Sequence, residues 1–308
     1  MTRILVTGAS GLLGLNFALQ YHHQHKVMGV VHSHPLVGTP FDIFQADLTE
    51  PGNVTRVLDA AQPEVVLHCA AMANIDACER NPQKTWEVNV EVAAELAHAA
   101  AHDGFRLVHL STDAVFDGLS GDYDEESQPN PLNVYAHSKL AAERKVLETF
   151  PETLVARVNF YGWSLSGSRS LGEFFYYNLA AGKTIHGFTD VQFCPFEATI
   201  LADVLLKLVE SGCAGIYHVV SRECLSKYAF GCAIAEKFGL NKDLIRPITV
   251  HGGGLAAARS PNLCLRTDKL ATALGEPAPD QKQGLNRFHE LFLSGYPQWV
   301  RTLTPSRV

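Results

Sequence analysis

The sequence lacks any apolar run near the ~20 residues that a membrane-spanning helix needs. It also lacks an excess of basic residues, because 25 Lys and Arg stand against 32 Asp and Glu for a net charge of −7. This balance argues against nucleic acid or an anionic membrane as the main partner. The first residues run directly into a strand pattern, without the regions of a signal peptide. We therefore expect a cytoplasmic protein.

Paired cysteines and metal-binding motifs are also absent. The seven cysteines are an odd number with no Cys-x-x-Cys spacing, so we expect free thiols in a reducing cytoplasm. The histidines His22, His23 and His25 have neither a His-Glu-x-x-His spacing nor a carboxylate partner. A solvated helix end is the favoured interpretation of this cluster, and the sequence predicts no metal site.

The opening of the chain has the pattern of a dinucleotide-binding loop. Residues 3–7 form a short apolar strand pattern, and a helical pattern follows the glycines at 8, 11 and 14. Glycines at this turn allow the backbone to approach a pyrophosphate, whose charge the helix N-terminus favours. The alternative is a structural glycine turn. The predicted cofactor-binding residues of this loop are Gly8, Ser10, Gly11, Leu12, Leu13 and Gly14.

The second strand pattern, residues 26–31, bears on the choice of cofactor. An NAD-selecting domain usually places an acid near this point to bond the ribose 2′-hydroxyl, but here His32, Ser33 and His34 follow. Without a carboxylate there is no repulsion of a 2′-phosphate, so the sequence favours NADP(H) over NAD(H), although no arginine stands there. The acid that ends the third strand pattern, Asp47, is expected beside the adenine, next to Leu48.

Two further strand patterns contribute to the same region. After residues 64–69, the small residues Ala70 and Ala71 and then Met72 allow close approach to a cofactor, with a plain strand end as the alternative. Asn89, an amide within a predicted helix, is expected to tie the strand ends together through backbone hydrogen bonds. The fifth pattern, residues 105–110, delivers Thr112 to the carboxyl end of a central strand, where ligands bind in such sheets.

Residues 133–139 contain Tyr135 and Lys139, four positions apart and therefore on one face of a helix. A nearby ammonium stabilises a phenolate and lowers the tyrosine pKa toward the range useful for proton transfer to a carbonyl. Thr112 is expected to donate a hydrogen bond to the same carbonyl. Alone, the tyrosine–lysine spacing is weak evidence and is more typical of an amphipathic surface helix.

Five β–α alternations in about 150 residues predict an α/β fold with a doubly wound parallel Rossmann-type sheet. We expect a dinucleotide-binding domain over residues 1–160, with residues 197–212 returning to it. Residues 161–308 are expected to form mainly a smaller α/β substrate-binding portion and a C-terminal tail.

These motifs, in this order, resemble those of the extended short-chain dehydrogenase/reductases. The glycine loop, residues 68–71, 76–89 and 111–118, and the Tyr135–Lys139 pair further resemble the dTDP-4-dehydrorhamnose reductase family, to about residue 293. The resemblance implies reduction of the C4 ketone of a nucleotide-linked 6-deoxysugar by a nicotinamide hydride. It includes the regulatory β-subunit of methionine adenosyltransferase, and a homodimer is compatible with it.

Three departures from the family bear on specificity. Ala114 replaces a tyrosine after the Thr-Asp pair, Phe160 replaces a tryptophan, and Asn16 replaces an acid that serves a metal-assisted dimer in some members. Arg259 is the candidate for binding the nucleoside diphosphate, with a salt bridge that braces the small domain as the alternative. The predicted substrate-binding residues are Asp113, Asn159, Phe160 and Arg259.

The sequence thus predicts an NAD(P)-dependent oxidoreductase whose partner is a nucleotide sugar, with Thr112, Tyr135 and Lys139 as catalytic residues. The alternative is an NADP-binding regulatory subunit without catalysis, like the methionine adenosyltransferase branch. An epimerase or dehydratase is disfavoured, because no pair of glutamates accompanies Thr112 and Asp113 is followed by Ala114.

Overall fold

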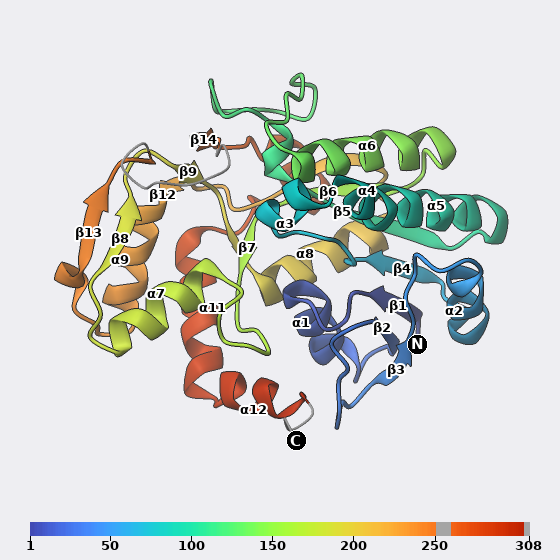
Figure 1. Cartoon of the computed structure of the whole chain (residues 1–308), viewed down its shortest axis with the longest axis horizontal. Helices are drawn as coiled ribbons and strands as arrows, with labels where there is room; N and C mark the ends of the chain where they lie inside the picture. Colours follow the sequence, from blue (N-terminus) through green and yellow to red (C-terminus); the bar gives the residue numbers. More distant parts are fainter. Residues whose placement is uncertain (251–259, 305–308) are drawn as a thin grey trace.

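The computed structural model of the chain describes residues 1–250 and 260–304 (Figure 1). Its centre is a sheet of seven strands in the order β11-β6-β5-β4-β1-β2-β3. Every pairing in this sheet is parallel, which confirms the predicted doubly wound sheet. The strands are β1 (Arg3–Thr7), β2 (Lys26–Val31), β3 (Asp42–Gln45), β4 (Val65–His68), β5 (Arg106–Thr112), β6 (Leu154–Val158) and β11 (Gly215–Val219).

Helices cover both faces of this sheet, because its strands alternate buried apolar side chains between two cores. Ile4 and Val6 of β1 pack in the core beneath α1 and α8, whereas Leu5 packs in the core beneath α2, α5 and α6. These helices are α1 (Leu12–Tyr21), α2 (Asn53–Ala61), α5 (Val92–Asp103), α6 (Val134–Thr149) and α8 (Ala198–Glu210). The carboxyl ends of the strands therefore open between the two layers.

A smaller portion of the chain has an aromatic core of its own, on the left in Figure 1. Trp163 and Phe288 stack there with ring centroids 4.0 Å apart. Helices α7 and α9 pack beside the parallel pair β8–β13. Its elements are α7 (Leu171–Ala180), β8 (Ile185–Phe188), α9 (Lys227–Lys237), β13 (Ile245–Ile248) and α11 (Gln281–Leu293).

Short elements join the two portions. Two small sheets have the orders β10-β7 and β12-β9-β14. The strands are β7 (Phe160–Tyr161), β9 (Gln192–Phe193), β10 (Phe196–Glu197), β12 (Leu225–Ser226) and β14 (Asn262–Leu263). The remaining helices are α3 (Ile75–Arg80), α4 (Pro82–Trp86), a π-helix (Glu87–Glu91), α10 (Asp268–Leu274) and 3-10 turns at Asp113–Val115 and Lys242–Leu244. No helix in the described ranges is long and apolar enough to cross a membrane.

The last described residues form a packed helix rather than the expected tail. Helix α12 (Tyr296–Thr302) buries Val300 fully, and Leu303 after it is 2% exposed. The Tyr296 hydroxyl donates a hydrogen bond to Asn16 Oδ1 in α1 at 2.8 Å. The expectation of a tail is therefore wrong over these residues, because Val300 and Leu303 pack in the core beneath α1 and α8.

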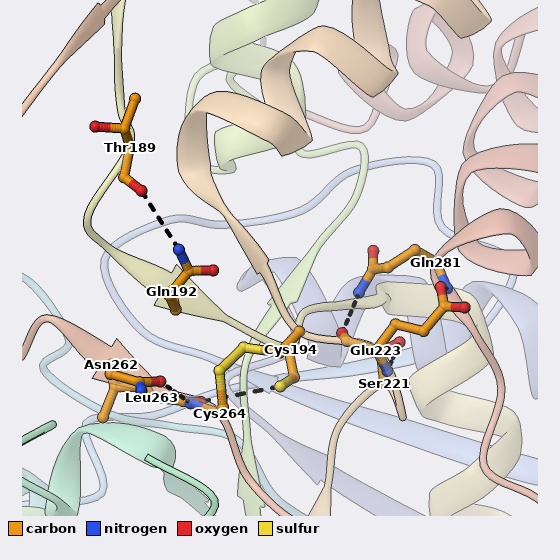
Figure 2. Close-up of a disulfide and its surroundings, with 10 residues drawn as sticks. Thr189, Gln192, Cys194, Ser221, Glu223, Asn262, Leu263, Cys264 and Gln281 are labelled. Carbon is orange, nitrogen blue, oxygen red and sulfur yellow. Dashed lines mark hydrogen bonds between the residues drawn. A yellow bond between two sulfur atoms is a disulfide. The ribbon is translucent and has the colours of Figure 1, made fainter. Parts of the chain in front are cut away.

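A disulfide corrects the expectation that all cysteines are free thiols. Cys224 and Cys264 are bonded, with Cα atoms 5.5 Å apart, and Cys194 lies beside them (Figure 2). The two bonded cysteines are 40 positions apart in the sequence, and the pairing of β9 with both β12 and β14 brings them together. Sequence spacing alone carries no sign of this approach. The other five cysteines are free.

Candidate active site

The turn between β1 and α1 fits a closely bound phosphate chain. Gly8 has a φ of +67°, and a Cβ there would lie 2.8 Å from backbone atoms of Ala70. A Cβ at Gly14 would lie 2.6 Å from the carbonyl oxygen of Gly8. Side chains at these two positions would therefore collide with the backbone, which explains the glycines. The turn exposes the N-terminus of α1, where the helix dipole favours an anion.

A cleft of about 520 Å³ runs from this turn along the carboxyl ends of the central strands. It is large enough for an extended ligand, and it joins the two groups of predicted residues, those for the cofactor and those for proton transfer. The predicted residues that line it are Gly8, Ser10, Gly11, Leu12, Leu13, Gly14, His32, Ser33, Asp47, Leu48, Ala70, Ala71, Tyr135, Lys139 and Phe160.

Met72 does not line the cleft, and Asn89 explains its position. The backbone N–H of Met72 donates to Asn89 Oδ1 at 2.8 Å, and Asn89 Nδ2 donates to the Met72 carbonyl at 3.1 Å. Asn89 Nδ2 also donates to Ser138 Oγ at 2.9 Å. Asn89 thus makes the predicted backbone hydrogen bonds at one strand end, after β4, but it joins that end to α6 rather than to a second strand end.

At the far end of the cleft, His32 Nε2 lies 3.4 Å from Asp47 Oδ2. Burial disfavours the ionised form of Asp47, but the hydrogen bonds from Thr49 and the charge of His32 outweigh it and lower the pKa of that carboxyl. The imidazole and the carboxylate thus lie together where the two strand ends β2 and β3 meet.

Tyr135 and Lys139 lie on one face of α6, as predicted. The helix begins after Asn133, whose side chain accepts the backbone N–H of Ala136 at 2.9 Å. Burial raises the pKa of Tyr135 to about 12; the hydrogen bond with Thr112 lowers it and the charge of Asp113 raises it further. The net shift is upward because burial dominates, so the tyrosine pKa is not lowered toward the range expected from the sequence. The phenol is instead held protonated at neutral pH.

Lys139 is itself buried, at 3% exposure, and its Nζ lies 3.4 Å from Nε2 of His109. Burial lowers its pKa to about 8, against the opposing charge of Glu143 one turn further along α6. The Glu143 carboxylate is bonded to Ser111 and to Arg157 of β6, at 2.8 Å from Arg157 Nη2. It therefore acts on Lys139 through its charge at a distance.

The substrate-side residues are partly brought together. Asn159 Nδ2 donates to Asp113 Oδ2 at 2.6 Å, and Asp113 is 3% exposed. Burial raises the pKa of Asp113 to about 6, while the hydrogen bonds from Asn159 and Thr112 lower it. Neither Asp113 nor Asn159 lines the cleft, whereas Phe160 does. Arg259 lies outside the described residues.

The sequence interpretation missed Arg169, which lines the cleft from the loop between β7 and α7. Its side chain is exposed, and its backbone N–H donates to Glu173 Oε2 at 3.1 Å. An arginine in a serine-rich loop gives no sequence signal for this position. His68 and His109, two buried histidines behind Lys139, were missed for a similar reason, because each sits within an apolar strand pattern.

The fold and the cleft agree with a known family. A family model described as the RmlD substrate binding domain matches residues 1–293. The chain belongs to this family. The match ends where the predicted resemblance ends, before α12.

Relatives within the RmlD family differ in what their names describe. A probable low-salt glycan biosynthesis reductase, Agl14, of Haloferax volcanii is 33% identical, over 93% of this chain and 97% of that protein. The methionine adenosyltransferase 2 subunit beta of Danio rerio is 31% identical, over 87% of this chain and 84% of that protein. A dTDP-4-dehydrorhamnose reductase from Bacillus anthracis, solved in complex with NADP, has a TM-score of 0.80 and 26% identity, over 94% and 99% of the two chains.

The predicted family resemblance, with its methionine adenosyltransferase branch, is thereby confirmed. The predicted enzyme class is confirmed as well, and this RmlD-family chain is an oxidoreductase.

Proposed function

We propose that this RmlD-family protein reduces the ketone of a nucleotide-linked 4-keto-6-deoxysugar with a nicotinamide dinucleotide, NADP(H) in preference to NAD(H). One observation carries the proposal. Tyr135 and Lys139 line the same cleft as the glycine turn, and Thr112 bonds to Tyr135 behind them. A dinucleotide bound at the glycine turn would therefore place its hydride donor beside the Tyr135 phenol, which can protonate the product.

The residues of the cleft fit a dinucleotide. The turn has no room for a Cβ at Gly8 or Gly14, so backbone amides lie open to a pyrophosphate. Lys139 would hold the ribose hydroxyls, and His32 and Ser33 line the end where a 2′-phosphate would lie. The bound nicotinamide supplies the hydride, which the protein itself has no group to provide.

Proton transfer is the work of the chain's own residues. The Tyr135 hydroxyl donates its proton to the ketone oxygen as negative charge develops there. A phenol with a pKa of about 12 is fully protonated at neutral pH and is still a much stronger acid than the alcohol that forms. Thr112 orients the phenol, and the Lys139 ammonium stabilises the phenolate left after the transfer.

Substrate recognition is assigned to two cleft residues. Phe160 presents an aromatic face to the cleft, which suits packing against a sugar ring. Arg169 is the candidate for contact with a phosphate group, because it lines the cleft, its side chain is exposed, and a guanidinium can make bidentate hydrogen bonds to a phosphate. Arg259 stays a proposal for the same role.

The test is oxidation of NADPH and of NADH by the purified chain with dTDP-4-keto-6-deoxyhexoses. Ketone-dependent oxidation supports the proposal, and no oxidation with any nucleotide-linked ketosugar contradicts it. A second candidate function, regulation of a partner enzyme, is favoured by the 31% identity to a methionine adenosyltransferase subunit. Co-purification with a methionine adenosyltransferase, without ketone-dependent oxidation, would support that role instead.

A further inference from the structure

A row of buried polar side chains crosses three central strands behind Lys139. Thr7 of β1 is in register with His68 of β4, and His68 is in register with His109 of β5. All three are at most 1% exposed. They lie on the sheet face that α6 covers, because the residues two positions before them pack in the core of that face. Polar groups at this depth need partners.

Each side chain in the row lies next to the following one, from Lys139 to Thr7. Lys139 Nζ lies 3.4 Å from His109 Nε2. The His109 and His68 rings are neighbours, with centroids 5.5 Å apart. His68 Nδ1 lies 2.7 Å from Thr7 Oγ1, which accepts the backbone N–H of Ala70 at 3.2 Å. The row thus joins the ammonium of α6 to the backbone beside the glycine turn.

The chemistry of the groups sets the direction of these hydrogen bonds. An ammonium only donates, so His109 Nε2 is the acceptor and the ring proton sits on Nδ1. Both imidazoles are neutral, because burial and then the charge of Lys139 lower the pKa of His68 to about 3 and that of His109 well below 6.5. Within the described structure, His109 Nδ1 and His68 Nε2 have no hydrogen-bond partner, so each ring is anchored through one nitrogen.

No other acceptor within the described ranges holds the ammonium. The Glu143 oxygens are taken by Arg157 and Ser111, and the hydrogen bond of Lys139 runs to His109. Cys69, which also acts on Lys139, has its pKa raised to about 12 by burial and is a neutral thiol. The position of the Lys139 ammonium therefore depends on His109.

We propose that His109 is a positioning residue for Lys139, and that His68, held by Thr7, keeps the His109 ring in place. The proposal rests on the proposed function for its catalytic consequence, since Lys139 serves the phenolate of Tyr135. His109 gives the ammonium a fixed direction toward the cleft without competing for charge, because the imidazole is neutral. A carboxylate in its place would attract the ammonium away from the cofactor ribose and the phenolate.

The test compares His109→Leu with His109→Asn, in which an amide oxygen can replace the ring nitrogen as acceptor. The groups that interact electrostatically with Lys139 are Glu143, Cys69, His68 and His109, and Tyr135 lines the same cleft. Loss of the acceptor disfavours the ammonium, so His109→Leu should lower the pKa of Lys139 and move the alkaline limb of the kcat/KM profile to lower pH. We expect kcat/KM to fall on the order of tenfold to a hundredfold, the range for a lost hydrogen bond to a charged group. His109→Asn should return the alkaline limb of the profile toward its wild-type pH and restore most of kcat/KM.

A measurement without turnover separates this proposal from the proposed function. NMR of lysine labelled with ¹³C at Cε reports the Lys139 pKa directly, and ¹⁵N shifts report the His109 tautomer. If the wild type reduces no ketosugar but its Lys139 pKa falls in His109→Leu and recovers in His109→Asn, the proposed function fails and the positioning role stands. A Lys139 pKa equal in all three proteins, or a His109 proton on Nε2, overturns the positioning role. The exposed His137→Asn on the same helix is the matched control and should change neither readout.

Discussion

Asn159 donates a 2.6 Å hydrogen bond to Asp113, a carboxyl that is 3% exposed and follows Thr112 directly. Burial raises the pKa of Asp113 from 3.8 to about 6 despite this bond. The folded state therefore holds the proton more tightly than the unfolded state, and stability falls as the pH rises from 3.8 through about 6.

Asp113→Asn should remove the loss of folding stability that the ionisation of Asp113 causes as the pH rises. Relative to wild type, the variant should gain roughly 2 kcal/mol in free energy of unfolding between pH 4 and pH 7, from a pKa shift of about two units. Urea unfolding at the two pH values measures the gain. Asp117→Asn is the control of opposite sign, because hydrogen bonds from Leu119, Asn130 and Tyr123 lower the pKa of Asp117. An equal response of the two variants to pH would refute the assignment.

Tyr135→Phe should abolish ketone reduction while cofactor binding survives. The phenylalanine keeps the ring in the cleft and removes only the proton donor, for which general acid catalysis predicts a loss of roughly 10² to 10⁴ in kcat. Fluorescence titration with NADPH measures binding, and steady-state kinetics measure turnover. Full activity in this variant would contradict the role of Tyr135 as proton donor. Tyr176→Phe, in the separate aromatic core, is the control and should retain turnover.

His32→Asp should shift cofactor preference toward NADH. The new carboxylate at the end of β2 would bond a ribose 2′-hydroxyl and repel a 2′-phosphate. We expect kcat/KM for NADPH to fall by about tenfold or more relative to that for NADH, since each tenfold step is 1.4 kcal/mol. A wild-type protein that already prefers NADH would contradict the inference from His32 and Ser33. His34→Asp, one residue beyond Ser33, tests whether the effect depends on position.

The sequence was sufficient for the features that depend on local pattern. The glycine turn and the shared face of Tyr135 and Lys139 each follow from spacing within one segment, and the central parallel sheet follows from the alternation of strand and helix patterns along the chain. The features it missed depend on residues far apart in the chain. Arg169 lines the cleft because the loop between β7 and α7 passes beside it. His109 contacts Lys139, which lies 30 positions away in the sequence. No local pattern encodes such an approach.

The tyrosine pKa shows a second limit of sequence reasoning. Spacing predicts that Lys139 stands near Tyr135, but the pKa of a phenol depends first on how deeply it is buried. Burial is decided by the whole fold, and here it raises the pKa of Tyr135 to about 12. The Tyr135–Lys139 spacing therefore could not predict the direction of the tyrosine pKa shift.

The disulfide gives a prediction that reducing agents test. Cys224 and Cys264 close a loop with a sequence separation of 40, for which chain entropy predicts a stabilisation of about 4 kcal/mol. Dithiothreitol should therefore lower the free energy of unfolding of the wild type by up to this amount. Cys264→Ser should start from the lower value and show no response to dithiothreitol. A reductant-sensitive Cys264→Ser would mean that another bond causes the effect.

A third cysteine, Cys194, could exchange with the disulfide and give a mixture of cross-links. Cys194 lies within 4.8 Å of both bonded cysteines, so it is placed to exchange with them. Exchange requires a thiolate, and burial raises the pKa of Cys194 to about 12, which keeps it a thiol at neutral pH. Mass spectrometry of a digest made at pH 6 without reductant should therefore find the Cys224–Cys264 peptide and none linked through Cys194. Cys194→Ser should keep the wild-type response to dithiothreitol, because the cross-link does not involve it.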